Sequence, residues 1–146
     1  IPGITTSPLF DEPLFVLARR DSPYYNGMTP EQLSGKDEIF IAYTESFHKW
    51  HDRYWPDNQY HIRLSDASDI ISFMNDNKKW AFVSASSALR LLKENLFSIY
   101  RLLIDTPNFS FYLVEKNIKY QSQAAQIYKK ELIEFLRNDI NVIARI

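Results

Sequence analysis

The chain has 146 residues, no cysteine and only three glycines. Without cysteine there is no disulfide framework and no thiolate for catalysis, which fits a reducing compartment such as the cytosol. So few glycines argue against long flexible linkers, and no phosphate-cradling glycine loop is found. A formal net charge of −1 gives no general attraction to a polyanion, and no basic stripe typical of nucleic-acid-binding domains is visible.

Long hydrophobic runs are missing as well. The apolar run at residues 14–18 is far too short to span a bilayer, and no basic signal sequence opens the chain. We therefore expect a cytoplasmic location and no membrane partner. Because the chain begins with Ile1 and not with methionine, we expect it to be a piece of a longer protein.

Apolar and aromatic residues are plentiful. Hydrophobic residues make up 45% of the chain, with ten Phe, nine Tyr and three Trp, enough to fill the core of one domain. Tyr and Trp also suit the walls of a pocket or an interface, because each ring carries a polar group.

Segments with strand and helix periodicity alternate, which predicts an α/β fold. After a turn at residues 7–13, strands are expected at residues 14–19, 39–43, 60–64, 80–83, 99–104 and 109–114. Helices are expected at residues 29–33, 44–56, 65–75, 84–92 and 122–137, with Gly35 ending the first. The last helix has an apolar stripe of Ala125, Tyr128, Leu132, Phe135 and Leu136, whereas the apolar tail at residues 140–146 has no clear docking partner.

The segment DEPLFVLARRDSP at residues 11–23 resembles the hinge strand in the effector domain of LysR-type transcriptional regulators. Three later segments fit the family order: MTPEQL at residues 28–33, EIFI at residues 38–41 and SDASDIISFM at residues 65–74. The resemblance extends from Ile4 to about Arg137 and is a match of order and spacing. It departs from the family where NKK at residues 77–79 replaces glycines and Ser84 replaces a proline.

The resemblance implies a two-lobed α/β fold like a type 2 periplasmic binding protein. Residues 1–146 would form a partial effector-binding domain, with the second lobe complete and the first only partly present. Its hinge strands would lie at residues 14–20 and 109–114, its second lobe at residues 21–108, and a helix at residues 115–138 would return to the first lobe. The family's N-terminal DNA-binding region would be absent from this chain. The full-length protein would contact DNA only through that absent region.

Two strand ends are the leading candidates for a ligand site. A helix start after a strand presents free backbone N–H groups and hydroxyls, which suit an anion. The first is YTES at residues 43–46, where Thr44 and Ser46 either cap a helix or line a pocket, and where Glu45 opposes a simple anion site. The second is FVSASS at residues 82–87, with the same two alternatives. The predicted effector contacts are Tyr43, Thr44, Glu45, Ser46, Phe82, Val83 and Ser84.

Other groupings favour structural roles. His48 and His51 have the spacing to share a metal on one helix face, but without a further motif a surface or packing role is favoured. The aromatic group Trp50, Tyr54, Trp55 and Tyr60 is expected to pack in the core or on the lobe surface. The acids Asp37 and Glu38 lie beside a turn, where solvation explains them, and the pairs Arg19-Arg20, Lys78-Lys79 and Lys129-Lys130 are expected at the solvated surface.

We therefore expect a small-molecule effector-sensing and oligomerisation module of a LysR-type regulator, without catalytic residues, metal or cofactor. An organic acid is one candidate class of effector. Self-association as a dimer or tetramer is expected, with the helix near residues 66–75 as a candidate dimer face. Two alternatives stay open: a solute-binding protein of a transport system with the same fold, and a small α/β enzyme or structural interaction domain.

Overall fold

The computed structural model describes residues 2–117, 121–138 and 143–144 and divides the chain into two compact units. Unit 1 takes both ends of the chain, residues 1–12 and 108–146, and unit 2 is the continuous segment 13–107. The hinge strands and lobe limits expected from the sequence stay a prediction. No helix in the described ranges is both long and apolar enough to cross a bilayer.

Unit 2 is built on a central antiparallel sheet. Strand β2 (Leu14–Arg19) lies between β5 (Trp80–Ser84) and β6 (Phe97–Tyr100). A parallel pair, β3 (Ile39–Ile41) and β4 (Ile62–Leu64), joins this sheet through a parallel bridge between Glu38 and Trp80. The carboxyl ends of β3 and β5 therefore lie at the same edge.

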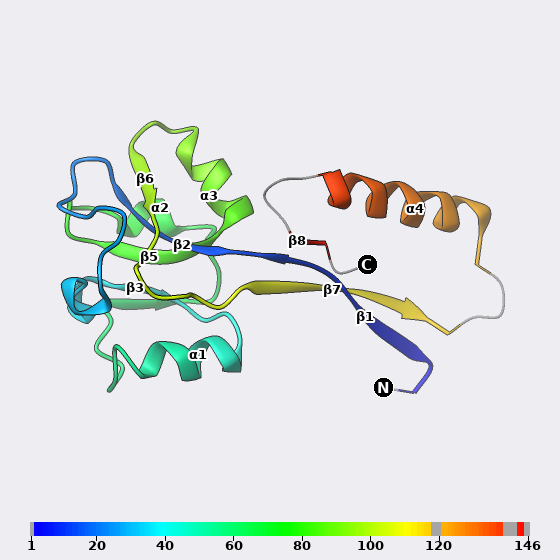
Figure 1. Ribbon diagram of the computed structural model, residues 1–146, viewed down its shortest axis with the longest axis horizontal. Coiled ribbons are helices and arrows are strands. Elements are labelled where there is room, and N and C mark those ends of the chain that lie inside the picture. The colour runs from blue at the N-terminus through cyan, green and yellow to red at the C-terminus, as the bar shows by residue number, and fades with distance from the viewer. Residues whose placement is uncertain (1, 118–120, 139–142, 145–146) are drawn as a thin grey trace. The chain divides into compact units, whose positions relative to one another are not determined.

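Side chains of β5 alternate between two packed layers, which is why all five of its residues are buried. Trp80 and Phe82 face the aromatic side chains of α1 (Glu45–Asp52) and its following turn. Ala81 and Val83 belong to an aliphatic core shared with α2 (Ile70–Phe73) and α3 (Ala85–Leu92). In Figure 1, α1 and α3 lie on opposite sides of the β2–β5 strand pair.

Two short 3₁₀ helices, Pro30–Gln32 and Gly35–Asp37, precede β3. Thr29 begins the first as predicted, and its N–H donates to Gln32 Oε1 at 2.9 Å. The expectation that Gly35 ends this helix is wrong, because Gly35 begins the second one. The predicted helix at residues 65–75 shrinks to the single turn α2, since Asp66 uses its carboxylate to bind the N–H of Ser68 and forms a turn.

Unit 1 contains the largest departure from the sequence prediction. Residues expected to form a turn belong to the nine-residue strand β1 (Ile4–Glu12), which pairs along its length with β7 (Phe109–Lys116). Pro8 lies within the expected turn, but the register shifts between Pro8 and Phe10, and such an irregularity accommodates a proline within a sheet. The short strand β8 (Ile143–Ala144) pairs with the other side of β1, so this part of the tail does have a partner.

Helix α4 (Gln123–Asn138) begins and ends within one residue of the prediction, and Lys129 binds the β7 residue Glu115 at 3.1 Å. The expected apolar stripe is buried only in part. Leu136 is 5% exposed, whereas Tyr128 and Phe135 are 69% and 66% exposed. Residues 140–142 and 145–146 of the predicted tail lie outside the described residues.

Candidate functional site

The two strand ends singled out in the sequence lie together in unit 2. Tyr43 lies two residues after the end of β3, and its hydroxyl donates a hydrogen bond of 2.7 Å to the carbonyl oxygen of Phe82 in β5. The bond joins residues 39 positions apart. We refer to residues 43–46 and 82–84 as the strand-end site.

Helix α1 begins at this site with a side-chain cap. The Thr44 hydroxyl accepts a hydrogen bond from the N–H of Phe47 at 3.1 Å and lies 3.0 Å from the Ser46 hydroxyl. The predicted capping role of Thr44 is therefore confirmed. Thr44, Glu45 and Ser46 are exposed, and the Glu45 carboxylate lies 3.3 Å from Lys49 Nζ, an exposed pair one helical turn apart.

The second strand end has a different chemistry. Ser84 occupies the N-cap position of α3, but its hydroxyl caps no backbone group and lies 3.5 Å and 3.3 Å from the hydroxyls of Ser86 and Ser87. The chain is fixed there by the N–H of Ala85, which donates to the Pro13 carbonyl at 3.1 Å. Of the two alternatives for this strand end, a cap by the Ser84 side chain is thus not found, and the pocket role stays a prediction.

The side chains of the second strand end are buried, which limits the groups that could contact a ligand. Phe82 is 2% exposed, Val83 is 0% exposed and Ser84 is 5% exposed. Contacts from Phe82 and Val83 would have to come from the main chain, because both side chains lie in the core layers. The role of all seven residues of the strand-end site in binding a ligand stays a prediction.

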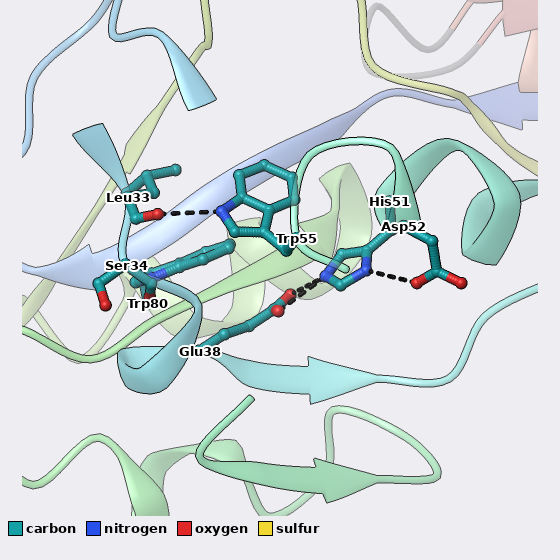
Figure 2. A network of polar contacts seen from close by, with 7 residues as sticks. All are labelled: Leu33, Ser34, Glu38, His51, Asp52, Trp55 and Trp80. Atoms are coloured by element: carbon teal, nitrogen blue, oxygen red, sulfur yellow. Dashed lines mark hydrogen bonds and ion pairs between the residues drawn. The ribbon is translucent and has the colours of Figure 1, made fainter. Parts of the chain in front are cut away.

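Sequence reasoning missed a buried polar pair behind α1. Glu38, expected to be solvated, is 1% exposed, and both of its carboxylate oxygens contact His51 Nε2 at 2.7 Å and 2.9 Å (Figure 2). The other ring nitrogen of His51 lies 3.3 Å from the Asp52 carboxylate. The available signal was that His51 follows Phe47 by one helical turn, which places it on the buried face of α1.

The pair holds protons more tightly than free side chains do. Burial raises the pKa of the Glu38 carboxyl, and the hydrogen bond from His51 offsets this only in part. Burial lowers the pKa of His51, but the hydrogen bonds and charges of Glu38 and Asp52 outweigh it, so the pKa of His51 is raised. The pair therefore retains its shared proton at a higher pH than an isolated histidine would.

The neighbouring aromatic residues confirm the packing role predicted for them. Trp50 and Trp55 are 9% and 5% exposed, and the Trp55 indole N–H donates to the Leu33 carbonyl at 2.9 Å. Trp80 makes the same kind of bond to the Ser34 carbonyl at 2.8 Å. These two bonds fasten the 3₁₀ segment against the sheet.

A second surprise is Lys79, which was expected at the solvated surface. It is 8% exposed, and its Nζ lies 3.1 Å from Asp76 and 3.6 Å from Asp37. Backbone hydrogen bonding from Lys78, followed by the hydrogen bond from Lys79, lowers the pKa of Asp76. These contacts give Asp37 and Lys79 structural roles at the start of β3 and β5.

Metal binding finds no support in the described part of the chain. Within residues 2–117, 121–138 and 143–144, no three His, Cys, Asp or Glu side chains are placed to hold a metal ion. The His48 ring packs edge-on against Phe40, with 4.9 Å between the ring centroids, and His51 binds Glu38.

No protein-family model matches the sequence, and no curated protein matches it either. Solved structures do match. The regulatory domain of MetR, a LysR family regulator from N. meningitidis, is 15% identical with a TM-score of 0.65, covering 99% of this chain and 70% of its own. The CcmR regulatory domain from Synechocystis, solved in complex with 2-PG, is 19% identical with a TM-score of 0.69, covering 92% and 68%.

The effector-binding domain of QuiR, solved in complex with shikimate, is 12% identical with a TM-score of 0.65, covering 92% of this chain and 66% of its own. Against the first three matched structures, the chain spans 46%, 70% and 43% of their lengths. At these identities the comparisons show the fold. The chain has the type 2 periplasmic-binding-protein-like fold of the regulatory domains of LysR-family transcriptional regulators.

Proposed function

We propose that the chain is the small-molecule-sensing part of a LysR-type transcriptional regulator and that the strand-end site supplies effector contacts. The observation that carries the proposal is the bond between Tyr43 and Phe82, which brings the carboxyl ends of β3 and β5 together. Ligands of open α/β sheets bind outside the carboxyl ends of strands. The CcmR and QuiR domains, which share this fold, were solved with 2-PG and shikimate.

An organic acid suits the chemistry of this site. Helix α1 begins there with exposed hydroxyls at Thr44 and Ser46, and α3 begins there with the hydroxyls of Ser84 and Ser87. Helix starts favour negative charge because their N–H groups point outward and the helix dipole is positive there. Glu45 opposes an anion, but its carboxylate is directed to Lys49, so the positive end of α1 is only partly offset.

The sensing role implies a non-catalytic, cytoplasmic module that acts through its parent protein. A ligand that binds one arrangement of the two lobes more tightly than another would shift the equilibrium between the arrangements. This shift would change the relation between the subunits that hold DNA. We propose that unit 2 is the complete second lobe and unit 1 part of the first. Supporting this, unit 1 leaves Tyr112, Val114 and Ile127 more than half exposed, at 52%, 62% and 51%.

The proposal predicts saturable binding of small acids to the full 146-residue chain. Shikimate and 2-PG are the first probes, titrated while the fluorescence of Trp50, Trp55 and Trp80 is recorded. Ser46→Ala and Ser84→Ala each remove one hydroxyl and should weaken binding by roughly ten- to a hundredfold, because each lost hydrogen bond to a charged group removes about 1.5–3 kcal/mol. The control Ser72→Ala, an exposed serine of α2, should leave the affinity unchanged.

Absence of saturable binding to either probe and to a panel of short mono- and dicarboxylates would remove the sensing assignment. Binding that Ser46→Ala and Ser84→Ala leave unchanged would move the effector contacts away from the strand-end site. The coding sequence upstream in the parent gene tests the regulator role. An upstream basic helix-turn-helix would support it, whereas a cleavable signal sequence there would make the chain a transport receptor.

A further inference from the structure

A pocket lies in unit 2 at the end of the central sheet opposite the strand-end site. It has a volume of about 430 Å³ and lies between the end of β2, helix α2 and the turn that leads into β6. Strand register fixes its separation from the strand-end site. Leu14 of β2 pairs with Ser84, whereas Arg19 pairs with Phe97 at the pocket. Five residue steps of about 3.3 Å put roughly 16 Å between the two positions.

The pocket has an apolar lining that the fold itself does not cover. Met74 and Phe97 form buried parts of it, at 4% and 5% exposure. Ile71 and Leu96 also line it, yet they remain 45% and 61% exposed. Exposed apolar side chains gathered in a concave, polar-rimmed surface are typical of a binding site, since burying them against a ligand is favourable.

The rim carries one positive charge that is not neutralised. The Arg19 guanidinium binds Asp21 through two parallel hydrogen bonds of 3.0 Å and 2.9 Å, so these two charges compensate each other. Arg20 is held by the side-chain and main-chain oxygens of Asn95, which are neutral. Within the described residues, no carboxylate lies within 4 Å of Arg20.

Arg20 is also well fixed. Its backbone N–H donates to the Leu96 carbonyl at 2.9 Å, and its guanidinium is anchored by Asn95, which adopts a left-handed conformation with φ of 56°. A guanidinium held in place loses little freedom when it binds a carboxylate, and its remaining N–H groups offer the fork geometry that carboxylates accept.

We propose that this pocket is a second ligand site, independent of the strand-end site, for a small molecule with an aliphatic body and one carboxylate. The apolar body lies against Ile71, Met74 and Leu96, and the carboxylate binds Arg20. A small molecule fits better than a protein surface because the feature is a concave pocket within the size range of small-ligand sites.

Octanoate is the probe, with 1-octanol as its uncharged counterpart. In the full chain with labelled methyl groups, octanoate should shift the Ile71, Met74 and Leu96 methyl signals saturably, and 1-octanol should bind about tenfold more weakly, as expected for loss of one charge-assisted hydrogen bond. Arg20→Gln should weaken octanoate by about the same factor and leave 1-octanol unchanged. Arg53→Gln, an exposed arginine elsewhere in unit 2, is the matched control.

Leu96→Glu places a second carboxylate at the rim and should abolish octanoate binding. Arg20 and Leu96 are both exposed, so Arg20→Gln and Leu96→Glu should keep the unfolding midpoint of the parent chain. Octanoate that leaves these methyl signals unmoved, or that binds Arg20→Gln as tightly as the parent, overturns the proposal. A dimer that covers these methyl groups and excludes octanoate also overturns it, because the pocket would then be an interface between copies.

Discussion

The Tyr43 hydroxyl donates a 2.7 Å hydrogen bond to the Phe82 carbonyl and so fastens the end of β3 to β5. Tyr43→Phe removes this donor and leaves a carbonyl in the sheet without that partner. We expect the free energy of unfolding to fall by about 1 kcal/mol in urea titration. Tyr54→Phe, which alters an exposed ring next to Trp50, should change it by less than half as much. Equal losses in the two variants would mean that the bond contributes no stability.

The buried pair Glu38–His51 predicts a specific dependence of stability on pH. Both pKa values are raised in the folded chain, so folding is favoured where the pair holds its proton. In the unfolded chain histidine releases its proton near its usual pKa of about 6.5. The contribution of His51 to stability should therefore be full below that pH and be lost as the pH rises from it towards the folded pKa of His51, with a slope of up to about 1.4 kcal/mol per pH unit. The raised pKa of Glu38 adds a separate loss that begins at lower pH, near the usual carboxyl pKa of 4.5.

Denaturant titrations between pH 6 and pH 9 measure this slope. His51→Gln should flatten it, whereas His61→Gln, which changes an exposed histidine of the same unit, should leave it in place. Glu38→Gln removes the largest cause that raises the pKa of His51, so it should flatten the slope as well. A slope that survives in His51→Gln would assign the pH dependence to another group.

Trp55 contributes both volume and a hydrogen bond to the core. Trp55→Phe loses the 2.9 Å bond to the Leu33 carbonyl and leaves space beside Trp80, so we expect a loss of about 2 kcal/mol in the free energy of unfolding. Trp50→Phe makes the same change in size without removing a hydrogen bond that the described residues show. If both variants lose equal stability, the bond to Leu33 adds nothing beyond packing.

Lys79 links Asp76 and Asp37 at the start of β5, and acid titration can test this link. Because the pKa of Asp76 is lowered in the folded chain, its contribution to stability is present above pH 3.8 and is lost as the pH falls through its folded pKa. Lys79→Met removes one cause of the shift and should make the loss of stability on acidification smaller. Lys78→Met keeps the backbone bond to Asp76 and serves as the control; an identical acid profile in both variants contradicts the link.

Local patterns were predictable from the sequence, and contacts between distant residues were not. The Thr44 cap of α1 and the boundaries of α4 follow from neighbouring residues, so the sequence pattern indicates them directly. Glu38 was misassigned because a polar residue beside a turn is usually solvated, and only the fold brings His51, thirteen positions later, to its carboxylate. Strand β1 was missed because the segment that contains Pro8 was expected to form a turn, whereas a local register shift accommodates the proline.

The strand-end site shows the same division. Both of its segments could be found from the sequence as strand ends followed by hydroxyl residues, and the structure places them at one edge of the sheet. The sequence could not predict that residues 44–46 are exposed while residues 82–84 are buried, because this difference depends on how β5 packs against α1. Tyr43 reaches β5 through a side-chain bond that no local pattern encodes.

Binding of a small acid at the strand-end site can be followed in an amide chemical-shift map of the labelled chain during titration with shikimate and then 2-PG. The largest saturable shifts should belong to the N–H groups of Thr44, Ser46 and Ser84 and of the neighbouring Ser87, with little change at Arg20 and Leu96. Shifts from both acids that spread without saturation, or that centre on residues away from the two strand ends, would contradict the claim.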